Sequence, residues 1–432
     1  MGLFYQYSGK YITSETTIKV QKQYLLGSLL IMVFFLLPMY IFPSGGYQLV
    51  DIPILFIFLW ALSHRDEINE DILRQIKPLI PFVLWVCLIN GINYILYPRD
   101  LWYLFSSAII IYGFFILYFF SIIFISLLKK RKNLNFIYIA LIMSIFGCFL
   151  VKGYSDEGRV ILSFNNPNQL AYFAVILCSY GILLIELNNN HEKVLLYDII
   201  NILFIIISFV FGLISLSRAG IFALICFGFY LLARARLFKV NIIVLFMTSI
   251  SFLYFYFFST YIFQEKIEVR PKRQWSLSEM IYGRDGILDR IYEPMKSLNG
   301  IEIVAGKGAG LLKEREELQR GFGKSKMVME VHNMFMGIFR NYGIIGFLLF
   351  ISWFVRYFWN SLTLKSGGWV IMALIIYNIG HDGIRFRSFW ILLAFLNAMI
   401  WLEKRRQENT APELLKPRLP LRLTAQQAHP IP

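Results

Sequence analysis

The chain has 432 residues, of which 57% are hydrophobic and only 16% are charged, and its formal net charge is +15. Soluble domains are nearer half apolar and a quarter charged, so this composition excludes a soluble enzyme, a fibrous protein and a disordered chain. In a membrane protein a basic excess follows from the positive-inside bias and from attraction to anionic lipid, so we expect membrane lipid and no nucleic acid as a partner.

Apolar blocks of about bilayer length recur along the chain. A helix needs about 20 mainly apolar residues to cross the hydrocarbon core of a membrane. The polar first 22 residues, with no small-residue cleavage site after the first block, predict that there is no signal peptide. The blocks predict an all-α polytopic integral membrane protein with about twelve transmembrane helices, at about 24–42, 47–62, 78–97, 103–127, 134–151, 169–186, 196–216, 220–233, 240–259, 333–355, 368–380 and 388–402.

Lys and Arg alternate between the loops in a regular way, which predicts the orientation. The basic loops contain Arg65, Arg74, Lys77, Lys129, Lys130, Arg131, Lys132, Lys193, Arg234, Arg236, Lys239, Arg356, Lys365, Lys404, Arg405 and Arg406. The alternate short loops contain only Arg99, Lys152, Arg159, Arg218, Arg385 and Arg387. We therefore expect the basic loops and both termini to be cytoplasmic.

The connection between the ninth and tenth blocks is far longer than a usual loop, which indicates a functional element. The predicted organisation is an N-terminal transmembrane bundle of about nine spans (1–258), a large and partly helical outer loop (259–331), about three C-terminal spans (332–403), and a cytoplasmic tail (404–432). The tail is expected to be disordered, because its composition changes at Thr410 and no apolar period follows.

Neither a metal nor a cofactor is expected from the ligand-type residues. Cys87, Cys148, Cys178 and Cys226 all lie in apolar blocks without a CxxC spacing, so they are interpreted as packing residues.

Three residues on the predicted outer side are candidates for chemistry. His332 stands where the long loop returns to the membrane, Arg218 lies in the shortest outer turn, and Arg284 lies within the long loop. Each also has an ordinary interpretation. The histidine could cap a helix at the interface, Arg218 could reach lipid headgroups, and Arg284 could pair with Asp285.

The set of outer residues is more informative than its members. The guanidinium fork of arginine recognises phosphate oxygens bidentately. A histidine of near-neutral pKa can remove a proton from a sugar hydroxyl, while arginines stabilise the charge on a departing pyrophosphate. These residues permit metal-independent glycosyl transfer from a polyprenyl-pyrophosphate donor, without requiring it.

The order of several short motifs resembles the O-antigen polymerase and O-antigen ligase superfamily. Asn166-Pro167-Asn168-Gln169 resembles an Asn-Pro-Asn segment that opens a mid-chain helix in these proteins. Leu216-Ser217-Arg218-Ala219-Gly220 resembles their Ser-Arg-Gly/Ala element, and Gly283-Arg284 resembles their loop Gly-Arg. His332-Asn333, followed by Gly343-Ile344-Ile345-Gly346, resembles their His-Asn…Gly-x-x-Gly signature. The resemblance covers residues of about 150 to 350.

The resemblance implies a fold, a location and roles for residues. Such proteins are multi-pass enzymes of the bacterial inner membrane with a large periplasmic loop and a periplasmic active site. By analogy, His332 would activate the acceptor hydroxyl, and Arg218 and Arg284 would bind the donor pyrophosphate. Arg159, Asn166, Asn168 and Asn333 are further candidates. The implied partners are a polyprenyl-pyrophosphate-linked oligosaccharide and a chain-length regulator.

Two activities occur in this superfamily, and they differ in the acceptor. A polymerase transfers the growing glycan to a new lipid-linked repeat unit, whereas a ligase transfers it to lipid A–core. Phe347 after the Gly-x-x-Gly pair and the Asn-Pro-Asn segment favour the polymerase, with the ligase as the alternative.

Two rivals from other classes are weaker. A polysaccharide flippase or another transporter would place charged residues near the bilayer midplane in two corresponding halves, which these blocks do not show. The other rival is a glycosyltransferase with a catalytic acid in its first outer loop. In this chain that loop has no acid from Pro43 until Asp51 at its edge.

Overall fold

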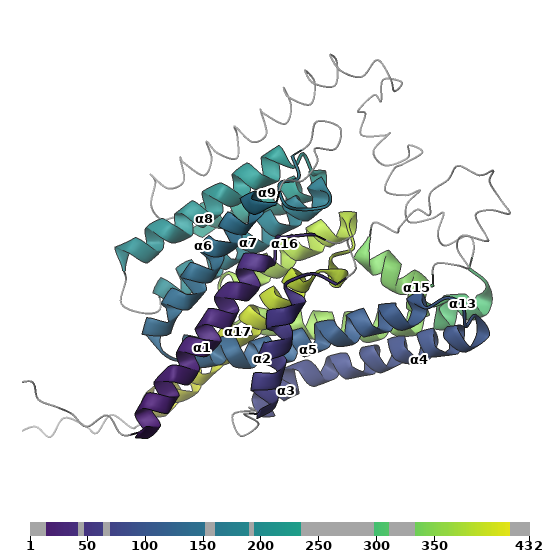
Figure 1. The fold of residues 1–432 in the computed structure, drawn as a ribbon, viewed down its shortest axis with the longest axis horizontal. Coiled ribbons are helices and arrows are strands. Elements are labelled where there is room, and N and C mark those ends of the chain that lie inside the picture. Colours follow the sequence, from purple (N-terminus) through teal and green to yellow (C-terminus); the bar gives the residue numbers. More distant parts are fainter. Residues whose placement is uncertain are drawn as a thin grey trace, which may run out of the picture.

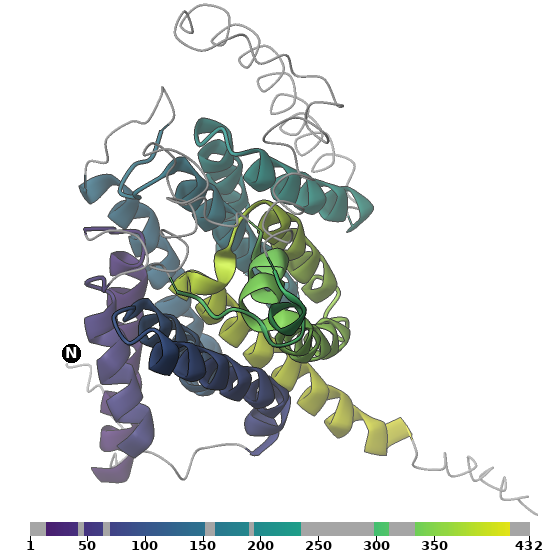
Figure 2. The same cartoon turned by 90° about the vertical axis from the view of Figure 1, so that its right-hand side faces the viewer.

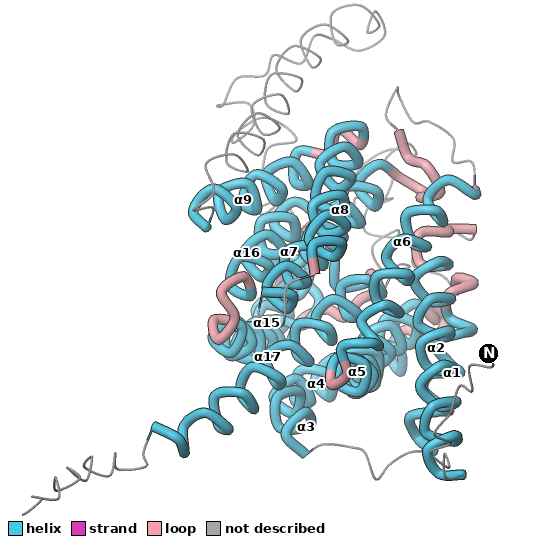
Figure 3. The backbone as a smooth tube through the Cα atoms, turned by 90° about the vertical axis from the view of Figure 1, so that its left-hand side faces the viewer, coloured by secondary structure: helices cyan, strands magenta, loops and turns pink. Residues whose placement is uncertain are grey.

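The computed structural model describes residues 14–41, 47–63, 70–151, 160–189, 194–234, 298–310 and 333–414. Every regular element within these ranges is helical (Figure 3). The α-helices are α1 (Ser14–Leu36), α2 (Asp51–Ser63), α3 (Glu70–Ile76), α4 (Ile80–Leu96), α5 (Trp102–Leu128), α6 (Leu134–Leu150), α7 (Pro167–Asn189), α8 (Leu195–Ile214), α9 (Arg218–Arg234), α13 (Gly300–Ala305), α15 (Met334–Ser361), α16 (Gly367–Gly380) and α17 (Arg387–Leu414). Short 3-10 turns are η2 (Lys77–Leu79), η3 (Arg131–Asn133) and η4 (Gly383–Arg385).

Within the described ranges, six helical segments are long and apolar enough to cross a bilayer, as the sequence predicts for the blocks from 78–97 to 196–216 and for 333–355. They are Ile72–Leu96, Trp102–Leu128, Arg131–Leu150, Pro167–Asn189, Leu195–Ile214 and Met334–Ser361. An all-helical architecture with such segments fits a membrane protein.

The other predicted spans have mixed outcomes. Shorter apolar helices occupy Gln23–Leu36, Asp51–Leu62, Arg218–Ala233 and Gly367–Gly380, where four further spans are expected. The expected span 388–402 lies within α17, and 240–259 lies outside the described residues. The count of twelve spans therefore stays a prediction.

Helix α7 lies at the centre of the bundle and packs against α8, α9, α16 and α17 (Figure 1). Its most apolar 18-residue window is 94% buried, as expected for a helix that is apolar on every side. Small residues allow the close approach: a Cβ on Gly181 would lie 3.2 Å from the carbonyl oxygen of Asn201, and one on Gly220 would lie 2.7 Å from Cβ of Ala171.

The outer helices carry exposed apolar stripes. On α4, Leu84, Leu88 and Ile92 recur every four residues with exposed fractions of 63%, 51% and 46%. A continuous row of this kind is unfavourable in water but matches hydrocarbon, so these faces are suited to contact lipid.

Hydrogen bonds and an ion pair connect loops at the two ends of the helix bundle. At one end, the Ser163 hydroxyl donates to the carbonyl of Pro38 at 2.7 Å, and Arg387 forms an ion pair with Asp51. These residues belong to the loops that the charge pattern places outside, so we call this the outer end. Helices α4 and α5 project beyond the others here, and α13 lies beside their tips (Figure 1, right).

The opposite end gathers the loops of the other set, and we call it the inner end. The carboxylate of Glu186 on α7 accepts hydrogen bonds from the backbone N–H groups of Lys365 and Ser366, both at 2.8 Å. Tyr197 donates to the side chain of Asn135 at 2.6 Å. Each of these contacts joins loops of the same charge-defined set, while the topology and the assignment of the outer end to the periplasm stay predictions.

The predicted start of the disordered tail, at residue 404, lies within a helix. Helix α17 continues to Leu414, so residues 404–414 of the expected disordered tail are helical. Ion pairs at i,i+3 spacing favour this continuation: Arg406 lies 3.7 Å from Glu403, and Arg405 lies 3.6 Å from Glu408. Lys404 also donates to Asn360 on α15 at 3.2 Å, which ties the extension to the bundle.

Candidate functional site

The described candidates all lie at the outer end of the bundle. Arg218 begins α9, Asn166 and Asn168 flank the start of α7, and Asn333 precedes α15. His332, Arg284 and Arg159 lie outside the described residues. Four of the seven candidates can therefore be placed directly.

Asn166 serves as the N-cap of α7. Its side-chain oxygen accepts a hydrogen bond from the backbone N–H of Gln169 at 2.9 Å, and the Gln169 side chain accepts from the N–H of Asn165 at 3.0 Å. Pro167 occupies the first helical position, where a missing N–H is harmless. Asn166 thus has a complete structural role as a helix start.

Asn168 connects α7 to the last turn of α16. Its backbone carbonyl accepts a hydrogen bond from the Tyr377 hydroxyl at 2.5 Å, and the Tyr377 ring stacks on Tyr172 with ring centroids 4.4 Å apart. The start of α7 is therefore fixed against the C-terminal end of α16.

Arg218 is exposed and follows a strained turn. Leu216, two residues before it, has φ 52°, a left-handed conformation that is unusual for a bulky residue. Helix α9 then packs so closely on α16 that a Cβ on Gly380 would lie 2.8 Å from Cβ of Ala219. The turn thus places Arg218 beside the end of α16, next in space to the segment that begins at His381.

Asn333 fixes the position at which α15 begins. Its side chain accepts a hydrogen bond from the backbone N–H of Met336 at 3.0 Å, and only 6% of the residue is exposed. An N-cap of this type satisfies an otherwise unpaired helix donor. In the sequence, His332 directly precedes this cap.

Helix α15 kinks at Gly343, where φ is 66° and ψ is −173°. The sequence predicts one continuous span there, whereas the structure has two helical parts that meet at this glycine. A Cβ on Gly343 would lie 2.3 Å from the carbonyl oxygen of Val304, and one on Gly346 would lie 2.9 Å from Trp85. Both glycines of the Gly-x-x-Gly element are therefore required by backbone conformation or close packing.

The carbonyls freed by the kink find new donors. The N–H of Gly308 donates to the carbonyl of Asn341 at 2.8 Å, and the Trp85 indole donates to the carbonyl of Tyr342 at 2.9 Å. These bonds replace the intrahelical partners that the kink removes. The kink is thus held by a segment of the long loop and by α4.

That segment, residues 306–310, is rich in glycine but does not act as a phosphate cradle in this conformation. The N–H of Ala309 donates to the buried Asn90 side chain at 3.0 Å, and the Ser106 hydroxyl donates to the carbonyl of Ala309 at 3.2 Å. Asn90 in turn donates to Ser107 at 3.0 Å. The segment therefore docks the long loop onto α4, α5 and α15, a role that the sequence interpretation missed.

A pocket that is partly open to solvent lies beside the first part of α15. Figure 2 shows the molecule from the right-hand side of Figure 1, the side on which α13 lies. Asp382 and Arg385 contribute the charges of the cavity and form an ion pair with N···O 3.1 Å. The cavity is lined by Phe82, Ser106, Ile109, Ile110, Ala309, Met334, Gly337, Ile338, Asn341, Tyr342, Asp382, Ile384 and Arg385.

The charge pattern of the sequence places Arg385 in an outer loop and indicates no role for Asp382. The signal available in the sequence was the polar run His381-Asp382-Gly383-Ile384-Arg385 between two apolar blocks. Such a run is ordinary for a short loop. Only the fold shows that it faces the residues that follow His332.

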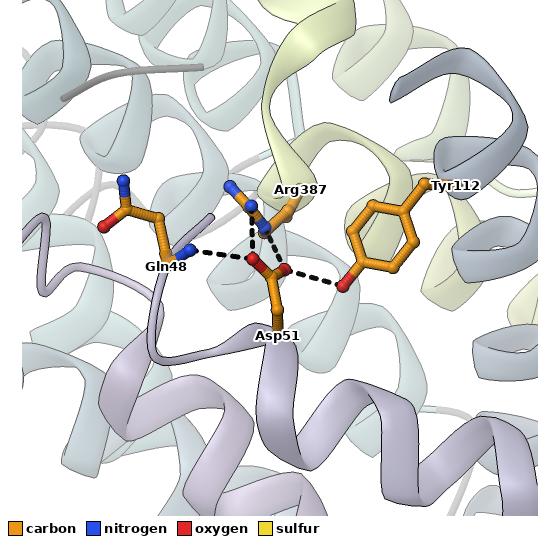
Figure 4. Close-up of polar contacts among 4 residues, drawn as sticks. All are labelled: Gln48, Asp51, Tyr112 and Arg387. Atoms are coloured by element: carbon orange, nitrogen blue, oxygen red, sulfur yellow. Dashed lines mark hydrogen bonds and ion pairs between the residues drawn. The ribbon is translucent and has the colours of Figure 1, made fainter. Parts of the chain in front are cut away.

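A buried ion pair anchors the far side of this run (Figure 4). Arg387, the first residue of α17, binds Asp51 through Nε at 2.5 Å and through Nη2 at 2.6 Å. Asp51 also accepts from the Tyr112 hydroxyl at 2.7 Å and from the N–H of Gln48 at 2.8 Å. The first acid of the outer side is thus saturated with donors that join α2, α5 and α17.

The electrostatics of this pair keep Arg387 charged. Burial lowers the pKa of Arg387, but the hydrogen bonds and negative charge of Asp51 raise it by more, so its pKa lies above the usual value. A cation held in this way fixes the start of α17 and, two residues earlier, Arg385.

A metal site is not formed by the residues that the structure places. Within the described ranges, no three His, Cys, Asp or Glu side chains lie close enough together to hold a metal ion. Among the described residues, the charged groups that line the cavity are one carboxylate and one guanidinium.

A search of protein-family models and a search of curated proteins both find no match to the chain. The family resemblance therefore rests on the motifs quoted above, and the activity that it implies is a proposal.

Proposed function

We propose that the chain is an O-antigen polymerase of the bacterial inner membrane, which transfers a growing glycan from polyprenyl pyrophosphate to a hydroxyl of a new lipid-linked repeat unit. One observation carries the proposal. The start of α15, two residues after His332, lines a cavity at the outer end together with Asp382 and Arg385. A reacting hydroxyl bound there would lie near the proposed base.

The chemistry needs a base and a site for the leaving group. The hydroxyl oxygen of the acceptor attacks the anomeric carbon of the donor, and His332 takes the hydroxyl proton. The bond between that carbon and the phosphate oxygen breaks, and the pyrophosphate leaves with the electron pair. Arg218 and Arg284 stabilise the charge that it gains.

The geometry near Arg218 supports this division of labour. Arg218 is an exposed cation on a strained turn beside the end of α16, and Asp382 follows that end by two residues. A pyrophosphate at Arg218 and a sugar in the cavity would thus be neighbours. The glycine-rich segment 306–310 is not needed for phosphate, because its N–H groups donate to protein acceptors.

The test is the glycan profile of a strain that lacks this gene, with surface lipopolysaccharide and lipid-linked glycan resolved by size. We expect surface core capped by a single repeat unit. Bare core, with long glycan on the polyprenyl carrier, would instead assign the chain as an O-antigen ligase. An unchanged profile would refute both activities.

A further inference from the structure

We infer that the cavity beside α15 binds a neutral sugar of the acceptor glycan, and that Asp382 and Arg385 hydrogen-bond its hydroxyls. The inference rests on the proposed function and adds the substrate class for this part of the site. We call the cavity the acceptor pocket.

The charge of the acceptor pocket argues against phosphate. Asp382 and Arg385 lie 3.1 Å apart and offset each other, and their side chains are 22% and 33% exposed. A pyrophosphate would have to displace the carboxylate or bear its repulsion. A sugar hydroxyl both donates and accepts, so it can accept from the guanidinium and donate to the carboxylate.

The walls of the acceptor pocket also suit a sugar ring. Its lining residues include Phe82 and Tyr342, whose rings pack edge to face with centroids 5.9 Å apart. Asn341 and Ser106 are also among the residues that line it. Apolar walls with a few converging polar groups are typical of sites for small ligands.

The location links the acceptor pocket to the proposed base. Met334 lines the pocket and follows His332 by two residues, a separation that a chain can extend to about 7 Å at most. A sugar in the pocket would therefore present a hydroxyl within the neighbourhood of His332. The pyrophosphate of the donor would take the other side, toward Arg218.

Two glycines allow a direct binding test. A Cβ added at Gly337, which lines the pocket, meets no atom within 4 Å, and the same holds for Gly300 at the exposed start of α13. We would introduce Gly337→Cys and Gly300→Cys separately and measure their rates of labelling by a membrane-impermeant maleimide in the purified full-length protein. The unsubstituted protein, with its four native cysteines, gives the background.

The probes separate sugar from phosphate. One is the oligosaccharide released by mild acid from the lipid-linked pool of the deletion strain, and the other is inorganic pyrophosphate. We expect the oligosaccharide to slow labelling of Gly337→Cys severalfold and pyrophosphate to leave it unchanged. Labelling of Gly300→Cys should respond to neither. Protection of Gly337→Cys by pyrophosphate, or no protection by the oligosaccharide, would overturn the inference.

Variants of the ion pair identify the binding groups. Adding Asp382→Asn or Arg385→Gln to Gly337→Cys should abolish protection by the oligosaccharide. The matched substitution Arg99→Gln, at an exposed arginine in another outer loop, should retain it. Retained protection in both pocket variants would refute the role of the pair.

The acceptor pocket and the proposed function can fail separately. Chain extension by the unsubstituted protein on lipid-linked oligosaccharide is measured in the same preparation. Extension without protection of Gly337→Cys would refute the acceptor pocket alone. Protection without extension would support a sugar site and refute the polymerase.

Discussion

The ion pair between Asp51 and Arg387 joins residues 336 positions apart and should be a main determinant of stability at the outer end. The two side chains are 18% and 15% exposed, so each would be left largely without solvent if its partner were removed. Removal of one partner of a buried pair costs about 3–5 kcal/mol. Because the pair keeps some contact with solvent, we expect about 3 kcal/mol for Arg387→Gln or Asp51→Asn.

The double variant distinguishes a true pair from two separate contacts. If the side chains stabilise each other, Asp51→Asn with Arg387→Gln should cost little more than one single variant, with a coupling energy of about 2–3 kcal/mol. Independent contributions would instead add to about 6 kcal/mol. Tyr112 donates to Oδ1 of Asp51 and the N–H of Gln48 donates to Oδ2, so the single side-chain oxygen of an asparagine keeps an acceptor for only one of these donors.

The assay is the fraction of detergent-solubilised protein that stays monodisperse in size-exclusion chromatography after heating. We expect each single variant to lower the midpoint temperature clearly and the double variant to lower it no more than slightly further. Arg405→Gln removes an ion pair whose arginine is 50% exposed and should leave the midpoint nearly unchanged. A double variant whose midpoint falls by the sum of the two single shifts would refute the reasoning.

Four further predictions concern the site and the kink. His332→Ala and Arg218→Ala should each abolish chain extension while the protein accumulates normally in membranes, and full activity in either would remove that residue from the site. Arg284→Lys should lose nearly as much activity as Arg284→Ala, because lysine lacks the bidentate fork; an active lysine variant would indicate simple charge neutralisation. Gly343→Ala should lower the thermal midpoint through about 1–3 kcal/mol of backbone strain plus a steric clash, whereas Gly337→Ala, with open space at its Cβ, should not. Chain extension should persist after treatment with a chelator, and loss that added divalent metal restores would contradict the metal-independent mechanism.

The local elements of the fold could be predicted from the sequence. The apolar blocks predict ten of the described apolar helices to within a few residues at most ends, since a run of apolar residues is a property of neighbours in the chain. The start of α7 was also predictable, because the Asn166-Pro167 cap acts within its own first turn. The end of α17 was not predictable, because the continuation of this helix depends on ion pairs between its side chains and on a hydrogen bond to Asn360 of α15.

The site depended on contacts between distant segments. The sequence by itself determined that the chain is helical and apolar over membrane-length stretches, and it pointed to outer residues with suitable chemistry. Only the tertiary structure decided that Asp382 and Arg385 face the start of α15, that residues 306–310 hold the kink at Gly343, and that Asp51 binds Arg387. Length and apolar character place a helix in a membrane, but in lipid they do not select its neighbours. Those are selected by small-residue contacts such as Gly380 on Ala219 and by buried polar pairs, whose partners are far apart in the chain.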